Sequence, residues 1–144
     1  MKNQIYSILL LAASSTLSFG QCNQDVTITA SKTEYLDGSG VIQRTVDEQS
    51  TIQIKGSQII ITPGSADHQM TGTIESTTCD WSTPYKEGKT VSKAVFEDPS
   101  REQRHVTLTT EGKGGKVTFL MEIDEMPDKK IRVSVVDFQE TKKE

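Results

Sequence analysis

The segment that is richest in residue types able to do chemistry is residues 79–85, Cys-Asp-Trp-Ser-Thr-Pro-Tyr. It holds the only tryptophan of the chain and one of its two cysteines. A tryptophan beside a disulfide packs against the sulfur atoms more often than it binds a ligand. Aromatic rings at the rim of a β-barrel also stack on small ligands or anchor a partner protein. Both interpretations stay open, and the residues predicted to bind a ligand or partner are Trp81, Tyr85 and Tyr35.

A second segment, residues 111–116, has the sequence Glu-Gly-Lys-Gly-Gly-Lys, whose glycines and lysines are typical of loops that hold phosphate. A nucleotide-binding P-loop needs Gly, four residues and then Gly-Lys-Ser/Thr between a strand and a helix. Here Val117 follows the last lysine and begins an apolar alternation typical of a strand. The segment therefore predicts a hairpin turn and no nucleotide site.

No catalytic residue, metal ligand or cofactor is predicted. The histidines His68 and His105 lack the i, i+4 spacing of a zinc-binding helix, and no Gly-x-Ser-x-Gly motif is present. An acidic segment before the last strand lacks the ligand spacing of an EF-hand and predicts a solvated turn. Its four acidic residues are Glu122, Asp124, Glu125 and Asp128.

Residues 1–20 have the build of a secretory signal peptide. A basic residue, Lys2, precedes an apolar run over residues 8–13, and the small residues Ser18 and Gly20 suit a signal peptidase. We predict cleavage after Gly20 and export of residues 21–144 to the periplasm or the medium. Lipidation at Cys22 is disfavoured, because Gln21 occupies the place of the small residue that a lipoprotein signal needs. The apolar run is shorter than the about 20 residues of a spanning helix, and no later segment approaches that length, so we expect no membrane span in the mature chain.

Export permits a disulfide between the two cysteines, Cys22 and Cys79. Because only two cysteines exist, the pairing has no alternative partner. The bond would close a long loop and stabilise the fold by about 3–4 kcal/mol. We therefore predict a bridge between the new N-terminus and the middle of the chain.

The charge of the mature chain argues against nucleic acid as a partner. Lys2 is the only charged residue of residues 1–20, so 15 Lys and Arg remain against 20 Asp and Glu. Binding a phosphate backbone draws on clustered basic residues, which this acidic chain does not offer. The size of the mature chain fits a single β domain over residues 21–144, with residues 139–144 as a frayed polar tail.

The pattern beyond residue 25 predicts β-strands. In residues 26–31 apolar and hydroxylated side chains alternate, which gives a strand one inward face. Gly56-Ser57 between two Ile-rich runs predicts a hairpin with a type II′ turn. A helical turn is expected at most once, with residues 97–104 as the place to look.

Eight or nine such strands follow one another with short connections, which favours an antiparallel meander that closes as a barrel or half-barrel. A two-sheet sandwich is the alternative. The barrel is preferred because the Cys-Trp-Cys spacing of antibody domains is missing.

The export signal, the strand spacing and the late turns at residues 111–115 and 126–129 resemble small exported bacterial β-meander proteins, loosely of the lipocalin-like type. That resemblance implies a barrel that binds a ligand. It implies no particular ligand, since the Gly-x-Trp motif of classical lipocalins is absent and Trp81 follows Asp80 in mid-chain.

These observations lead to three expectations for function. The first is a non-enzymatic exported binding module that holds a small apolar ligand or a partner protein. The second is an envelope or surface interaction protein, such as a hydrolase inhibitor. The third is a hydrolase without a readable motif.

Overall fold

The computed structural model describes residues 22, 24–64, 66–97 and 100–141. The predicted signal peptide at residues 1–20 lies outside the described residues. Among the described residues, no helix has the length and apolar character needed to cross a bilayer.

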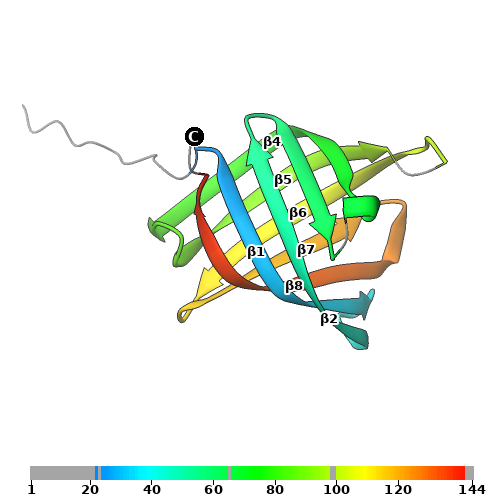
Figure 1. The fold of residues 1–144 in the computed structure, drawn as a ribbon, viewed down its shortest axis with the longest axis horizontal. Helices are drawn as coiled ribbons and strands as arrows, with labels where there is room; N and C mark the ends of the chain where they lie inside the picture. The colour runs from blue at the N-terminus through cyan, green and yellow to red at the C-terminus, as the bar shows by residue number, and fades with distance from the viewer. Residues whose placement is uncertain (1–21, 23, 65, 98–99, 142–144) are drawn as a thin grey trace, which may run out of the picture.

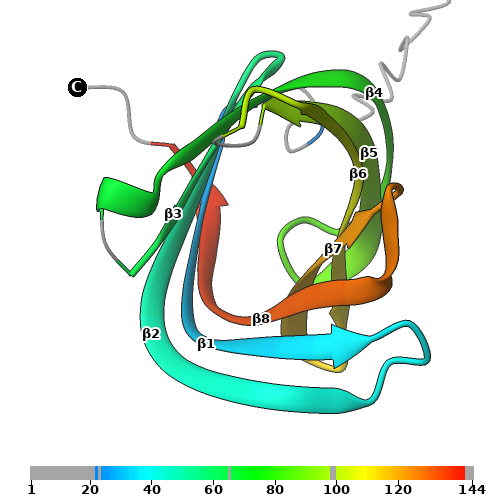
Figure 2. The same ribbon diagram turned by 90° about the vertical axis from the view of Figure 1, so that its right-hand side faces the viewer.

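Eight antiparallel strands form a closed barrel in which each strand pairs with the next and the last pairs with the first (Figures 1 and 2). This confirms the predicted all-β meander, in its barrel rather than its sandwich form. The strands are β1 (Val26–Asp37), β2 (Ile42–Lys55), β3 (Gln58–Pro63), β4 (Met70–Thr83), β5 (Glu87–Glu97), β6 (Gln103–Lys113), β7 (Lys116–Ile123) and β8 (Met126–Glu140).

The hairpin turns follow from their glycines. Gly56 has a φ of 59°, whereas Ser57 is not among the described residues with positive φ, as a type II′ turn requires. At the β6–β7 turn Gly114 and Gly115 both have positive φ, 60° and 79°, which two consecutive glycines tolerate without strain. The glycine- and lysine-rich segment is therefore a hairpin turn, as predicted.

The helical turn of the described chain is not at residues 97–104. It is a 3₁₀ turn, Ala66–His68, between β3 and β4. β5 extends to Glu97 and β6 begins at Gln103, so strands occupy both ends of the segment in which the turn was expected. Two residues between these strands, 98–99, lie outside the described residues.

β8 also runs further than the predicted tail boundary at residue 139. Glu140 pairs with Val26 of β1, and the backbone N–H of Thr141 donates a 2.8 Å hydrogen bond to the carbonyl of Asp25. The Thr141 and Thr27 hydroxyls are also 2.8 Å apart. Residues up to 141 are therefore attached to β1, and residues 142–144 lie outside the described residues.

Side chains fill the waist of the barrel. Because strand side chains alternate in direction, every second residue points inward and the inward residues of all eight strands meet at the axis. Ile28, Ile52 and Ile59 are the most completely buried of the large side chains. They pack with Ala30, Ile61, Ala94, Phe96, Val106, Leu108, Phe119, Met121 and Val133. Inside the barrel formed by the described residues, a ligand therefore has room towards the two ends.

Candidate functional site at the two ends of the barrel

The predicted disulfide joins Cys22 to Cys79, with Cα atoms 5.9 Å apart. It attaches the segment that precedes β1 to the second half of β4. We call this end of the barrel, which also holds the β2–β3, β4–β5 and β6–β7 turns, the disulfide end. The opposite end is called the Tyr35 end, since Tyr35 lies near the end of β1 there.

Three aromatic rings pack together at the disulfide end. The rings of Trp81 and Tyr85 each contact Phe138 of β8 edge-on, with centroid distances of 5.7 Å and 4.9 Å. The Tyr85 hydroxyl also donates a 3.1 Å hydrogen bond to Oε1 of Gln24, beside the disulfide. Burial, and more weakly the charge of Glu140, raise the pKa of the Tyr85 phenol. The predicted residues Trp81 and Tyr85 are thus brought together, and they contact the protein itself.

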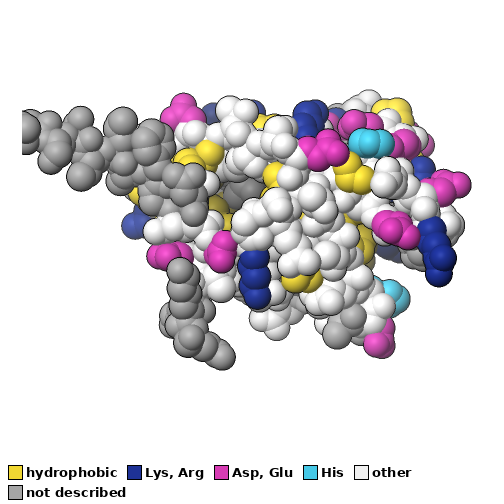
Figure 3. All heavy atoms as spheres, turned by 90° about the horizontal axis from the view of Figure 1, so that it is seen from above, with side chains coloured by type: hydrophobic (Ala, Val, Ile, Leu, Met, Phe, Trp, Pro, Cys, Tyr) yellow, Lys and Arg dark blue, Asp and Glu magenta, His cyan; other side chains and the backbone are white. Residues whose placement is uncertain are grey.

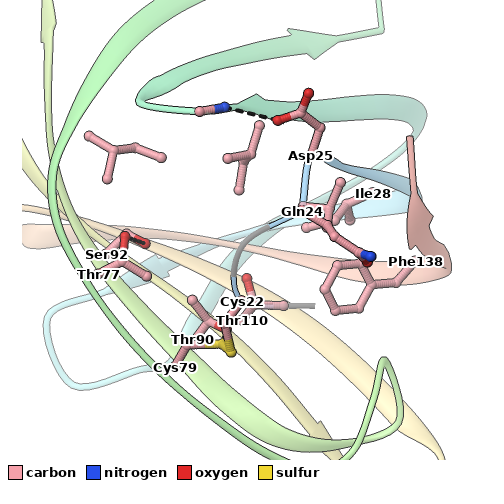
Figure 4. A pocket seen from close by; sticks show the side chains of 14 residues that line it. Cys22, Gln24, Asp25, Ile28, Thr77, Cys79, Thr90, Ser92, Thr110 and Phe138 are labelled. Carbon is pink, nitrogen blue, oxygen red and sulfur yellow. Dashed lines mark hydrogen bonds between the residues drawn. A yellow bond between two sulfur atoms is a disulfide. The ribbon is translucent and has the colours of Figure 1, made fainter. Parts of the chain in front are cut away.

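Hydroxyl groups and the ring of Phe138 line a space at this end of the barrel (Figure 4). Thr90 Oγ1 accepts a 2.7 Å hydrogen bond from the Trp81 indole and lies 3.4 Å from the Cys79 sulfur. Thr77 and Ser92, paired across β4 and β5, have hydroxyls 3.2 Å apart. The described chain offers no hydrogen-bond partner to the hydroxyl of Thr110, which also lines this space. A polar group therefore remains open to a ligand.

The space is a cavity of about 280 Å³. Its apolar wall consists of Val26, Ile28, Ile54, Ile74 and Phe138. Two lining residues, Gly56 of the β2–β3 turn and Thr77 of β4, are solvent-exposed, so the cavity opens between that turn and β4. The register explains this opening, because in the described chain β4 pairs with β3 only from Met70 to Thr73.

The cavity has little charge. The one acidic residue in its lining, Asp25, accepts a 3.0 Å hydrogen bond from the backbone N–H of Gly56 through its carboxylate (Figure 4). No Lys, Arg or His belongs to the lining formed by described residues. An anionic ligand would lose its hydration there without gaining an opposite charge, and the single carboxylate is already held by the β2–β3 turn, so the lining favours an uncharged ligand.

The third predicted aromatic residue, Tyr35, lies at the opposite end of the barrel. Its ring is covered by the guanidinium of Arg44, whose Cζ is 4.3 Å from the ring centroid. Tyr35 borders an open depression of about 710 Å³, which continues inward into a chamber of about 90 Å³. The structure therefore does not bring the three predicted aromatic residues into one site.

The inner chamber at the Tyr35 end carries a polar group that sequence reasoning missed. Ser50 is 3% exposed, and its hydroxyl has no hydrogen-bond partner among the described residues. An unpaired buried hydroxyl costs about 1–3 kcal/mol, so such groups are uncommon in folded proteins. Next to it, Glu48 accepts a 3.2 Å hydrogen bond from the hydroxyl of Thr33.

Outside the barrel, His105 and Glu125 form an exposed pair, with Nδ1 and Oε1 2.7 Å apart. The Glu125 carboxylate also accepts hydrogen bonds of 3.0 Å from the His105 backbone N–H. The hydrogen bond between the side chains raises the pKa of His105 and lowers the pKa of Glu125. Glu125 belongs to the predicted acidic turn, and Glu122 of the same turn pairs with Lys130 at 3.4 Å. Within the described ranges, no three His, Cys, Asp or Glu side chains gather as a metal site would require.

The outer surface is mixed in charge. Figure 3 shows acidic and basic side chains interspersed towards one end of the molecule, with mostly uncharged side chains in the middle of that face. The exposed large hydrophobic residues of the described chain are Val41, Ile42, Met70 and Val136. Trp81 and Tyr85 are not among them.

Comparison of the chain with protein-family models, with curated proteins and with solved structures gives no match in any of the three.

Proposed function

We propose that the mature chain is an exported, non-enzymatic binding module, a loosely lipocalin-like barrel that holds a small uncharged ligand in the cavity at the disulfide end. The observation that carries the proposal is the cavity of about 280 Å³ with the unpartnered hydroxyl of Thr110 in its wall. The disulfide supports the export part of the proposal, because such bonds persist in oxidising compartments.

The dimensions and lining of the cavity define the ligand class. A cavity of roughly 150 Å³ holds one benzene molecule, so this one suits a ligand of about ten non-hydrogen atoms. Its aliphatic wall and the Phe138 ring favour an apolar body. The hydroxyls of Thr77, Thr90, Ser92 and Thr110 favour one or two hydrogen-bonding groups on the ligand.

Two alternatives have weaker support. A partner-binding surface around Trp81 and Tyr85 would need exposed rings, whereas both rings pack on Phe138 and are half-buried. A hydrolase would need a nucleophile beside a base, and His105 is instead held by Glu125 outside the barrel. No specific observation favours either of them.

The experiment is a calorimetric titration with 4-ethylphenol, which combines an apolar ring with one hydroxyl. We expect a Kd of about 1 mM or tighter, in line with the ligand efficiency of compounds of this size. Ethylbenzene lacks the hydroxyl and should bind several-fold more weakly. Equal binding of the two compounds, or no binding of either, would contradict the proposal.

Two variants locate the site. Thr110→Val keeps the volume of the side chain and removes the free hydroxyl, so it should abolish the advantage of 4-ethylphenol over ethylbenzene. Thr118→Val on β7 removes a hydroxyl outside the cavity lining and serves as the matched control. If the two variants behave alike, the ligand does not bind at Thr110.

A further inference from the structure

We infer that the Tyr35 end of the barrel contains a second binding site, which takes the ammonium group of a primary amine attached to a linear apolar chain. The site consists of Glu48, Ser50 and Thr33 at the inner chamber. The filled waist separates it from the cavity at the disulfide end, so it does not depend on the proposed function.

The carboxylate of Glu48 is the first feature that points to a cationic ligand group. This half-buried side chain borders both the open depression and the inner chamber. Its hydrogen bond comes from a neutral hydroxyl, that of Thr33, and no Lys, Arg or His of the described chain forms an ion pair with it. Arg104 and His68 also line the open depression, but neither forms an ion pair with Glu48. A partly desolvated anion without an ion-pair partner favours a ligand that brings the positive charge.

The position of Ser50 points to a ligand group with several N–H donors. Glu48 and Ser50 are two residues apart on β2, so they share the inward face of the strand, and Thr33 joins them from β1. Ser50 lines the inner chamber, and its buried hydroxyl lacks a partner. A primary ammonium group has three N–H donors, and the three side chains offer a carboxylate and two hydroxyls as acceptors. One ligand group would thus satisfy the unpartnered hydroxyl and the uncompensated charge together.

The shape of the space points to a linear apolar chain. The inner chamber, about 90 Å³, is smaller than the roughly 150 Å³ that holds a benzene, so it admits an ammonium group and the first carbons of a chain but no ring. Its other walls are apolar, formed by Ile52, Ile61, Phe119, Met121, Ile131 and Val133. Met70 and Met121 border both spaces, so an apolar chain can continue outward along flexible thioether side chains.

Calorimetric titration with hexylamine and with hexanol tests the inference. The two probes share a linear chain, and only hexylamine carries an ammonium group at neutral pH. We expect hexylamine to bind about tenfold or more tightly than hexanol, because charge-assisted hydrogen bonds are the stronger kind. Equal affinities, or no binding of hexylamine, would overturn the inference.

Variants separate a specific site from general charge attraction. Glu48→Gln should weaken hexylamine binding about tenfold, whereas Glu97→Gln, which removes a carboxylate from the border of the same depression, should change it less than twofold. Ser50→Ala should weaken hexylamine binding while leaving the melting temperature unchanged or raised, because it deletes an unpartnered hydroxyl. Equal losses in the two glutamate variants would overturn the inference, as would a Ser50→Ala protein that loses stability and keeps its affinity for hexylamine.

Discussion

The indole nitrogen of Trp81 on β4 donates a 2.7 Å hydrogen bond to the hydroxyl of Thr90 on β5. The bond holds the ring over two glycines: a Cβ at Gly88 would lie 2.7 Å from Cδ2 of Trp81, and one at Gly112 would lie 2.8 Å from Cζ3. The indole thus fills the space left by the missing side chains of β5 and β6. Trp81 is therefore part of the barrel wall at the disulfide end.

Thr90→Val should destabilise the protein by about 1–2 kcal/mol. The substitution keeps the shape of the side chain but leaves the partly buried indole N–H of Trp81 without its acceptor. Urea unfolding, followed by the emission of this single tryptophan, measures the loss. Thr118→Val is the matched control. If Thr118→Val destabilises the protein as much as Thr90→Val does, the hydrogen bond between Trp81 and Thr90 does not account for the loss of stability.

Removal of the Cys22–Cys79 disulfide should cost about 4 kcal/mol, because the bond closes a loop with a sequence separation of 57. The double variant Cys22→Ser/Cys79→Ser and the reduced wild-type protein should unfold at similar urea concentrations, both well below the oxidised protein. Both changes should also weaken the binding of 4-ethylphenol, because both cysteines line the cavity. A loss below about 1 kcal/mol would contradict this prediction.

Gly72→Ala should destabilise the barrel by about 1–3 kcal/mol through overpacking. Gly72 pairs with Phe96 across β4 and β5, and a Cβ at Gly72 would meet three atoms of the buried ring at 2.8–2.9 Å. The double variant Gly72→Ala/Phe96→Leu tests the cause, because the smaller side chain relieves the clash. Its total loss should be smaller than the sum of the two single losses, and strict additivity would mean that the clash is not the cause.

The His105–Glu125 pair should make the stability of the fold depend on pH, and the directions of the two pKa shifts give the sign of this dependence. The pKa of His105 is raised above its ordinary value of 6.5, so its contribution to stability is complete below pH 6.5 and is lost as the pH rises through the raised value. The pKa of Glu125 is lowered from 4.5, so its contribution is present above pH 4.5 and is lost as the pH falls through the lowered value. The pair therefore stabilises the fold most between pH 4.5 and 6.5.

An NMR titration of the His105 ring measures the shift in its pKa directly. Glu125→Gln should lower this pKa, because the hydrogen bond from Glu125 is the largest cause of the shift. Asp124→Asn is the control, since the charge of Asp124 raises this pKa less than Glu125 does. If Asp124→Asn lowers the pKa of His105 as much as Glu125→Gln does, the hydrogen bond between the His105 and Glu125 side chains is not the cause of the shift.

The sequence predicted the inward faces of the strands but not the grouping of residues at the two ends. Alternation in residues 26–31 was enough to place Ile28 inside the barrel. Neighbours across strands depend on register and closure, which alternation does not determine. Tyr35 was therefore grouped with Trp81 and Tyr85, although it lies at the opposite end.

The cavity-lining hydroxyls that sequence reasoning missed belong to ordinary residues in strands. Thr90, Thr110 and Ser50 look like the other hydroxylated positions of β-strands, and only the structure shows which of them face a cavity. The alternation around them does predict inward hydroxyls. Which hydroxyls lack a partner depends on the residues opposite, which the register decides.

A titration of ¹⁵N-labelled protein with 4-ethylphenol, followed by two-dimensional NMR, shows whether the cavity at the disulfide end binds this ligand. We predict that the largest shift changes occur at the disulfide end, at the amides of Thr77, Thr90, Ser92 and Thr110 and at the Trp81 indole N–H. The amides of Tyr35 and Met70, at the opposite end, should stay unchanged. Shift changes confined to the Tyr35 end, or none at saturating ligand, would contradict the account.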